Sequence, residues 1–471
     1  MPASTLETDY LVIGTGATAM AFVDTLLSEQ AEARVLMVDR HHRPGGHWNE
    51  AYAFVRLHQP SEFYGVASRE LSHGIKDSVG LNAGLYGLAS GAQVLAYFDQ
   101  VMQHRFLPSG RVQWLPMSEY SAGADGTHRI SSLVSGETRS VSVRKKVVDT
   151  THAKTAVPST HPPKYQVAAG VRCIPLNGLP HIGRPPARYT VVGSGKTGMD
   201  AILWLLENQV APDAIRWVVP RDAWLLNRAN FQPGLENYED SMAGIIGQFE
   251  AMAEAASVAD LLARLERRQL LLRIDHNVQP TTYRCAIVSM AELAQLRRIR
   301  DVVRLGHVRR IEAAQIVLDH GSIAADPDTL YIDCSAAAIV MPPKLPVFDG
   351  ERINLLMVRT CQPVFSAAVI AWVESHGADA AEKNSICAVV PSPEAPIDWL
   401  RMWAVNLRNM GRWRQHADLS AWLLQCRLNG IAVFLRGVKP DDTARLGLLR
   451  KMGETSAAAA AKLPALLAAA A

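Results

Sequence analysis

The stretch that decides the fold is Asp9–Ala19, with the sequence DYLVIGTGATA. Its apolar residues Tyr10–Ile13 are typical of a buried strand, and the pattern that follows predicts a helix from Met20 to Leu27. Between them lies G-x-G-x-x-A, in which the first glycine permits a tight turn and the second lets a pyrophosphate approach the backbone. The small third residue lets helix and strand pack closely. The expected phosphate-binding residues are Gly14, Gly16, Ala17, Thr18 and Ala19.

A second predicted strand, Ala33–Val38, supports this interpretation. It ends at Asp39, about 20 residues beyond the glycines, where the motif places an acid that accepts hydrogen bonds from a ribose. We therefore expect Asp39, with Arg40 beside it, to bind the adenosine half of a dinucleotide. The alternative is a glycine turn in some other α/β fold.

The same pattern returns at Arg188–Asp200, with the sequence RYTVVGSGKTGMD. A predicted strand, Tyr189–Val192, meets a full G-x-G-x-x-G and then an apolar helix, Met199–Leu206. A P-loop is excluded, because G-x-x-x-x-G-K-[ST] would need a glycine where Thr190 stands. The expected nucleotide-binding residues of this second motif are Gly193, Ser194, Gly195, Lys196, Thr197 and Gly198.

The residue after the next strand indicates which nucleotide the second motif binds. Strand Ile215–Val219 is followed by Arg221, and a guanidinium suits a ribose 2′-phosphate better than an acid would. The prediction is NADPH, with Lys196 and Arg228 as secondary candidates. Asp222 comes directly after Arg221, so NADH stays open as an alternative.

Composition excludes several other classes of function. The chain has 471 residues, with 48 Lys+Arg against 45 Asp+Glu, a balance that favours neither nucleic acid nor an anionic membrane as partner. Six scattered cysteines without a C-x-x-C predict neither a dithiol redox centre nor a zinc knuckle. Their spacing, together with an N-terminus unlike a signal peptide and no long apolar run, predicts a cytoplasmic protein that does not enter membranes. His41, His42 and His47 lack a second cluster of ligands, so no metal is expected.

A tight loop, Gly45-Gly46-His47-Trp48, follows Asp39. Together with GTGATA and Asp39, it resembles the G-G-x-W of the two-dinucleotide-domain flavoproteins, most closely the class B flavin monooxygenases of the flavin-containing and Baeyer–Villiger types. The resemblance covers residues 9–375 in organisation and implies that the first unit binds FAD, with Gly46, His47 and Trp48 near the middle of the cofactor. The fingerprint F-x-G-x-x-x-H-x-x-x-W-P is not recognisable before Gly193, which leaves the reaction subtype open.

The resemblance also implies where the flavin ring lies. In that family the segment equivalent to Tyr52–Val66 passes the isoalloxazine, so Arg56, His58 and Gln59 are the predicted catalytic residues and Tyr64 is a further contact. A donor near the ring would stabilise the reduced flavin. An ordinary amphipathic strand and turn is the alternative.

Later segments supply weaker candidates. The aromatic and amide-rich stretch Trp224–Gln232 follows a strand and could line a substrate or nicotinamide pocket. Cys361 opens a predicted helix, and because it has no partner at readable spacing we expect a packing role for it. Gln362 and Ser366, in the same helix, are possible flavin contacts.

Several expectations concern the fold alone. Residues 223–300 are predicted to be mostly helical, and Ser140–Val143 and Lys146–Thr150 to be separate strands. Leu355–Arg359 is predicted as a strand, and the tail Ala457–Ala471 as a frayed helix or disordered. Where the resembling family has A-T-G this chain has Asp149-Thr150-Thr151-His152, which puts close backbone packing there in doubt.

Together these observations predict an α/β protein with an FAD-binding Rossmann-like domain, an inserted NAD(P)H-binding Rossmann-like domain and a helical C-terminal region. The expected boundaries are 1–165 for the first part of the FAD domain, 170–330 for the NADPH domain, 331–394 for the return to the FAD domain, and 395–471 for the helical region.

The predicted function is that of an FAD-dependent oxidoreductase. Its preferred form is an NADPH-dependent monooxygenase that inserts one oxygen atom from O2 into a small organic substrate through a C4a-peroxyflavin. The alternatives are a flavin reductase or dehydrogenase without oxygen insertion and a non-catalytic flavin-binding protein. The sequence does not name the substrate, and association into a homo-oligomer stays open.

Overall fold

The first glycine motif lies in a large, mostly parallel sheet. The computed structural model describes residues 5–123, 126–152, 157–336 and 344–469. The central strand is flanked by strands that come from both ends of the chain, in the order β22-β8-β1-β2-β5. These strands are β1 (Leu6–Ile13), β2 (Val35–Val38), β5 (Val112–Leu115), β8 (Thr138–Asp149) and β22 (Arg352–Asn354). The late strand β22 pairs parallel with β8, so the chain returns to this sheet after a long excursion.

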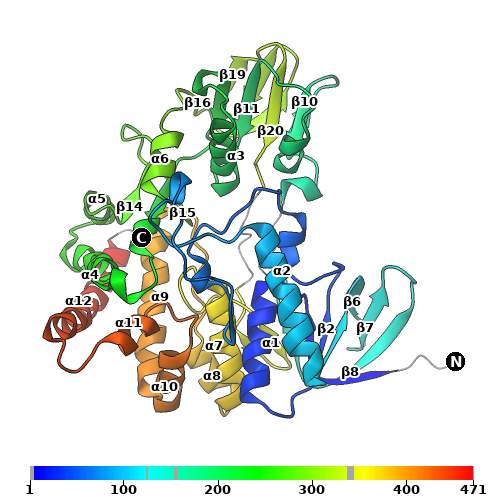
Figure 1. Ribbon diagram of the computed structural model, residues 1–471, viewed down its shortest axis with the longest axis vertical. Helices are drawn as coiled ribbons and strands as arrows, with labels where there is room; N and C mark the ends of the chain where they lie inside the picture. The colour runs from blue at the N-terminus through cyan, green and yellow to red at the C-terminus, as the bar shows by residue number, and fades with distance from the viewer. Residues whose placement is uncertain (1–4, 124–125, 153–156, 337–343, 470–471) are drawn as a thin grey trace.

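Three helices pack on this sheet (Figure 1). They are α1 (Ala17–Glu29), α2 (Gly91–Val101) and α7 (Pro363–His376). Almost every residue of α1 from Ala19 to Leu27 is buried, because α1 lies between the sheet and α7. The Tyr10 hydroxyl of β1 donates to Glu374 of α7 at 3.1 Å and so joins the first and the last element of this unit.

The excursion contains a second parallel sheet, which carries the second glycine motif. Its order is β10-β20-β11-β12-β16, with all neighbours parallel. The strands are β10 (Arg172–Pro175), β11 (Arg188–Val192), β12 (Ile215–Val218), β16 (Asp301–Val303) and β20 (Thr329–Asp333), and helix α3 (Lys196–Glu207) follows β11. Figure 1 shows this sheet in the upper lobe, apart from the first sheet. Two parallel sheets, the second inserted within the first, confirm the predicted fold class.

Residues 223–300 are less helical than predicted. Helices α4 (Tyr238–Glu254), α5 (Val258–Arg267) and α6 (Met290–Leu296) form, but between them lies a three-stranded sheet of order β14-β13-β15. Its strands are β13 (Ala223–Asn227), β14 (Leu271–Leu272) and β15 (Thr282–Val288). Most side chains of β13 and β15 are buried on both faces, so these segments show no alternation that separates a strand from a helix.

Antiparallel strands extend the first sheet and form most of a separate small sheet in the insertion. Strands β6 (Ser118–Ala122) and β7 (His128–Ser132) form a hairpin beside β8. Ser140–Val143 and Lys146–Thr150, predicted as separate strands, are one continuous strand, β8, which pairs with β7 at its start and with β1 along its length. A four-stranded sheet lies elsewhere in the insertion: β9 (Gln166–Val167), β17 (Val308–Ile311), β18 (Gln315–Leu318) and β19 (Gly321–Ala324).

The C-terminal region is helical, as predicted. It contains α9 (Pro396–Gln415), α10 (Ala417–Gln425), α11 (Ala432–Gly437) and α12 (Thr443–Ala468), and a short helix, α8 (Ala380–Ile386), precedes it. The predicted frayed or disordered tail belongs to α12, which packs along α4 and buries Ala459, Leu463 and Leu466 (Figure 1). Leucines spaced among the alanines supply the apolar side of this helix.

Short elements complete the chain: β3 (Gly65–Val66) pairs with β4 (Arg69–Glu70), and β21 (Phe348–Asp349) pairs with β22. The expected strand Leu355–Arg359 does not form, because the chain leaves the sheet after Asn354. Within the described ranges, no helix combines the length and the apolar character needed to cross a membrane.

Candidate functional site

The first glycine motif forms a narrow backbone crevice. Gly14 has φ +101°, and a Cβ there would lie 2.5 Å from the Thr150 hydroxyl oxygen. A Cβ on Gly46 would lie 3.0 Å from the Gly16 Cα, so the two glycine loops approach each other through their backbones. The Gly45 N–H donates to the Thr15 carbonyl at 2.9 Å and fixes this approach. The departure from A-T-G at Asp149–His152 therefore does not prevent close packing, because Thr150 packs closely here and donates to the Ile13 carbonyl.

Both glycine motifs leave the start of a helix uncapped. The N-cap residues of α1 and α3 are Gly16 and Gly195, and neither makes a side-chain cap hydrogen bond. By contrast, Ser90 and Ser289 cap α2 and α6 through their hydroxyls. The free N–H groups and the positive end of the dipole suit phosphate oxygens at both motifs. Ala17, Thr18 and Ala19, and likewise Lys196, Thr197 and Gly198, form the first turns.

Asp39 lies at the end of β2, as predicted, but protein donors surround its carboxylate. One oxygen accepts from the Thr15 N–H and hydroxyl, and the other accepts from the His41 N–H and ring at 2.8 and 2.7 Å. Although burial opposes ionisation, these hydrogen bonds hold the pKa of Asp39 below its usual value. Four donors fill the lone-pair positions of a carboxylate, so a ribose could bind here only if His41 or the Thr15 hydroxyl turned away. The neighbouring Arg40 is exposed and pairs with Glu119.

His41 joins two acids of this loop. Its ring bonds Asp39 through Nδ1 and Glu50 through Nε2. The hydrogen bonds to Asp39 and then to Glu50 raise the pKa of His41 to about 10. His41 is therefore a cation at neutral pH that ties the end of β2 to the loop containing Gly46.

The loop Gly46–Glu50 is a short 3-10 helix beside the crevice. Trp48 is buried, and its indole N–H donates to the Tyr64 hydroxyl at 2.8 Å. His47 is exposed, yet the surrounding protein desolvates its ring and lowers its pKa. Because the His47 side chain is accessible to solvent and yet closely surrounded by protein, it lines a crevice. A crevice is the shape that an extended dinucleotide requires.

The second motif repeats the close packing of the first. Gly193 has φ +123°, and a Cβ there would lie 2.5 Å from the Cys334 carbonyl oxygen at the end of β20. A Cβ on Gly198 would clash with the Gly193 carbonyl oxygen, so α3 packs directly on the turn. In the sequence, Cys334 begins a run of small residues, of which Ala337 and Ala338 lie outside the described residues.

The charged residues near the second motif have different partners. Arg221 is partly exposed and pairs with Glu394, and its carbonyl accepts from the Ser194 hydroxyl at 2.8 Å. Asp222 is engaged elsewhere, by Arg304 at 2.9 and 3.2 Å. Lys196 pairs with Asp200 of its own helix, which also accepts from the Tyr52 hydroxyl.

Arg228, a secondary candidate for the phosphate, is completely buried. Its guanidinium donates to the His58 carbonyl, the Asn82 amide oxygen and Glu292. It therefore binds protein groups and is not exposed to a nucleotide.

A cavity of about 450 Å³ joins the two units to the C-terminal helices. Thr18 of α1 and Gln362 before α7 line it, together with His58 and Gln59. From the stretch Trp224–Gln232, four residues line it: Leu226, Asn230, Phe231 and Gln232. This size lies in the range of small-molecule sites.

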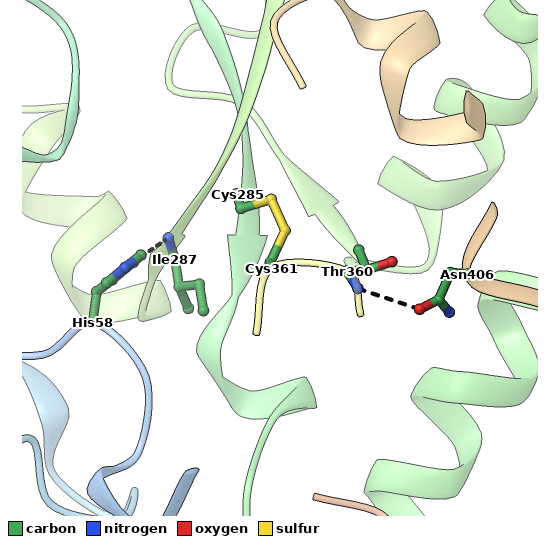
Figure 2. Close-up of a disulfide and its surroundings, with 6 residues drawn as sticks. All are labelled: His58, Cys285, Ile287, Thr360, Cys361 and Asn406. Atoms are coloured by element: carbon green, nitrogen blue, oxygen red, sulfur yellow. Dashed lines mark hydrogen bonds between the residues drawn. A yellow bond between two sulfur atoms is a disulfide. The ribbon is translucent and has the colours of Figure 1, made fainter. Parts of the chain in front are cut away.

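The three predicted catalytic residues are not brought together. His58 and Gln59 line the cavity, whereas Arg56 is exposed and donates to the Leu88 carbonyl at 3.2 Å. Burial, and then the charges of Lys196 and Arg228, lower the pKa of His58 to about 3. His58 is thus neutral at physiological pH, and its Nδ1 accepts from the Ile287 N–H (Figure 2).

Sequence reasoning missed a disulfide in the cavity wall. Cys285 of β15 and Cys361, just before α7, are bonded, and both line the cavity (Figure 2). The expected packing role of Cys361 is corrected, because its partner lies 76 residues earlier and only the tertiary structure brings the pair together. The Ser366 hydroxyl forms hydrogen bonds with the backbone around Arg359. Of the two predicted flavin contacts, Gln362 therefore has the more accessible side chain.

Sequence reasoning also missed the cavity residues contributed by α9. Asn406, Met410 and Arg414 line the cavity beside Arg359, which had been assigned to a strand. Their helical spacing of about four residues was a signal that they share one face. Among the described residues, no group of three or more His, Cys, Asp or Glu is placed to hold a metal ion.

Comparisons with known proteins support the fold and identify relatives. The uncharacterized protein Rv2000 of Mycobacterium tuberculosis is 50% identical over 437 residues, which cover 92% of this chain and 80% of the relative. No protein-family model matches the chain.

Among solved structures, OTEMO in complex with FAD and NADP superposes with a TM-score of 0.50 at 13% identity, covering 79% of this chain and 85% of the other. Cyclohexanone monooxygenase with bound cyclohexanone gives a TM-score of 0.48 at 14% identity, covering 79% and 88%. The chain therefore belongs to the family of the mycobacterial protein Rv2000, and its fold is that of the class B flavin monooxygenases.

Proposed function

We propose that the chain is an FAD-dependent oxidoreductase, and specifically an NADPH-dependent monooxygenase that uses O2 to oxygenate a small organic substrate. The observation that carries this proposal is that a strand of each parallel sheet leads into a helix whose N-cap residue is a glycine, so that no side chain caps the helix. A protein with a single nucleotide needs one such site, and two sites suit hydride transfer from one dinucleotide to another.

Each element around the first motif would have a distinct role toward FAD. The N–H groups at the start of α1 would bind the pyrophosphate, and the approach of Gly16 to Gly46 leaves room for backbone but not for side chains. Trp48, fixed by Tyr64, would hold the loop in place beside the cofactor. Bound FAD would supply hydride acceptance and the reaction with O2.

The contacts of Arg221 and Asp222 favour NADPH over NADH. Asp222, the acid that could have selected an unphosphorylated ribose, is held by Arg304. Arg221 has a partner, Glu394, that is itself partly exposed, so the guanidinium can exchange this carboxylate for a 2′-phosphate.

The test is reduction of the purified protein by NADPH and NADH without oxygen, followed by admission of O2 and analysis of an added substrate for incorporated oxygen. We expect a flavin absorbance band that NADPH bleaches. Arg221→Gln should weaken NADPH binding about 10- to 100-fold and leave NADH unchanged, because it removes a charged hydrogen bond. The matched control is Arg184→Gln, an exposed arginine that pairs with Asp328 away from the motif. A protein that takes up no flavin would refute the proposal.

The cavity disulfide favours a second candidate, a reductase that passes electrons to Cys285–Cys361. In that reaction the hydride lost by NADPH would supply two electrons and one proton, and with a second proton from water they would convert the disulfide to two thiols. Counting free thiols with a chromogenic disulfide before and after NADPH, without oxygen, decides between the two. Two additional thiols per chain support the reductase, and no increase supports the monooxygenase.

A further inference from the structure

The cavity has an unusual balance of charge. Three arginines line it, Arg284, Arg359 and Arg414, whereas no Asp or Glu among the described residues does so. Arg284 pairs with Glu394, the carboxylate that also pairs with Arg221. The remaining two have no carboxylate partner within the described part of the chain, which leaves the cavity positively charged.

Arg359 is the deepest of these cations. Burial, and then the charge of Arg414, lower the pKa of Arg359 to about 10, so it remains charged at neutral pH. Among the described residues its guanidinium has one hydrogen-bond partner, the Asn406 amide oxygen at 3.3 Å, although it carries five N–H donors. Arg359 is half-buried, so the N–H donors that Asn406 does not engage are available to a ligand in the cavity.

Asn406 and Thr360, the two neighbours of Arg359, form a polar binding site with it. Asn406 is fully buried and its oxygen also accepts from the Thr360 N–H at 3.2 Å, which fixes the direction of the amide (Figure 2). The Thr360 hydroxyl is buried and has no hydrogen-bond partner among the described residues. Arg359 and Thr360 both line the cavity, so a cation and a free hydroxyl are adjacent there.

Aromatic rings form another part of the wall. Phe249 and Trp403 meet edge to face at 5.4 Å between ring centres, and Trp399 lies 5.9 Å from Trp403. All three line the cavity. A ligand with a flat apolar body would fit against these rings.

We propose that the cavity binds an amphipathic organic carboxylate, with the carboxylate on Arg359 and Thr360 and the apolar body against Phe249, Trp399 and Trp403. A planar guanidinium pairs with a carboxylate through two parallel hydrogen bonds, and Asn406 is the positioning residue that presents it. The inference rests on the proposed function in so far as this carboxylate is the substrate that is oxygenated.

The test is calorimetric titration of the purified protein, as isolated, with three aromatic carboxylates (2-naphthoate, 2-naphthylacetate and 4-phenylbutyrate) and with their neutral amides. We expect at least one carboxylate to bind about tenfold or more tightly than its amide. Arg359→Met should remove this preference by weakening the carboxylate 10- to 100-fold, and Thr360→Val should weaken it severalfold. Arg412→Met is the matched control, because Arg412 lies on the same helix as Arg414, is exposed and does not line the cavity.

Equal binding of acids and amides, or no binding by any of the three carboxylates, would overturn the inference. So would an Arg359→Met protein that loses affinity for FAD or NADP+ but not for the carboxylate. Thr360→Val keeps the test decisive if Arg359→Met does not fold. Calorimetry needs no turnover, so failure of the proposed function would be seen separately, as a protein without a flavin band or without bleaching by NADPH.

Discussion

Replacing Arg228 should destabilise the structure strongly, because it removes the cation from a buried ion pair. The Arg228 side chain is 0% exposed and that of Glu292 is 11% exposed, and their closest atoms are 2.7 Å apart. Glu292 also accepts from the Ser289 N–H as part of the cap of α6. In Arg228→Met the Glu292 carboxylate would stay buried without a countercharge, which costs about 3–5 kcal/mol of unfolding free energy.

Arg228→Met should also affect His58, which lines the cavity. Arg228 donates to the His58 carbonyl at 3.1 Å, and the His58 ring accepts from the Ile287 N–H. Releasing His58 should therefore speed hydrogen exchange at the Ile287 amide. The assays are equilibrium urea unfolding and native-state hydrogen exchange of Arg228→Met, Glu292→Gln and the double variant.

The double variant separates the ion pair from simple loss of packing. If the pair is the cause, removing both charges should cost less than the sum of the two single changes, by about 1–3 kcal/mol. Arg264→Met, at an i,i+4 pair on the surface of α5, should change stability far less. An Arg228→Met protein destabilised by less than about 1 kcal/mol, or strict additivity in the double variant, would refute this reasoning.

Three further predictions follow from the same structure. Because the pKa of His41 rises from 6.5 to about 10 on folding, its charged form stabilises the protein fully below pH 6.5, and this contribution is lost as the pH rises toward 10. When the unfolding free energy is measured from pH 6.5 to 9, wild type should lose up to about 1.4 kcal/mol per pH unit more than His41→Gln. Parallel curves for the two proteins would contradict the assignment. Gly198→Ala should lower the unfolding free energy by about 1–3 kcal/mol, because the added Cβ clashes with the turn before α3. Binding assays should show weaker NADPH binding and unchanged FAD binding. An equal loss of both affinities would argue against a local effect. The Cys285→Ala/Cys361→Ala protein should lose about 4.5 kcal/mol of unfolding free energy, the chain-entropy value for a crosslink across 76 residues. Dithiothreitol should lower the unfolding midpoint of wild type but not of this variant.

The sequence by itself determined the two dinucleotide motifs and the fold class. Each motif is local: a buried strand, a glycine turn and a helix start lie within about a dozen residues, and the roles of Gly14 and Gly193 follow from backbone sterics that any chain of this pattern shares. The insertion of one parallel sheet within another was implied by the family resemblance, and the return of β22 to the first sheet confirms it.

Only the tertiary structure decided what surrounds the motifs. The cavity joins Thr18, Cys285, Arg359 and Arg414, which come from four distant segments, and no local pattern encodes their distances. The buried strands β13 and β15 lie in a stretch predicted to be mostly helical, because a segment buried on both faces has no alternation to reveal its period. The partners of Asp39 and Arg228 likewise depend on which loops the fold brings beside them, and it is these partners that fix whether a charged side chain is free to bind a ligand.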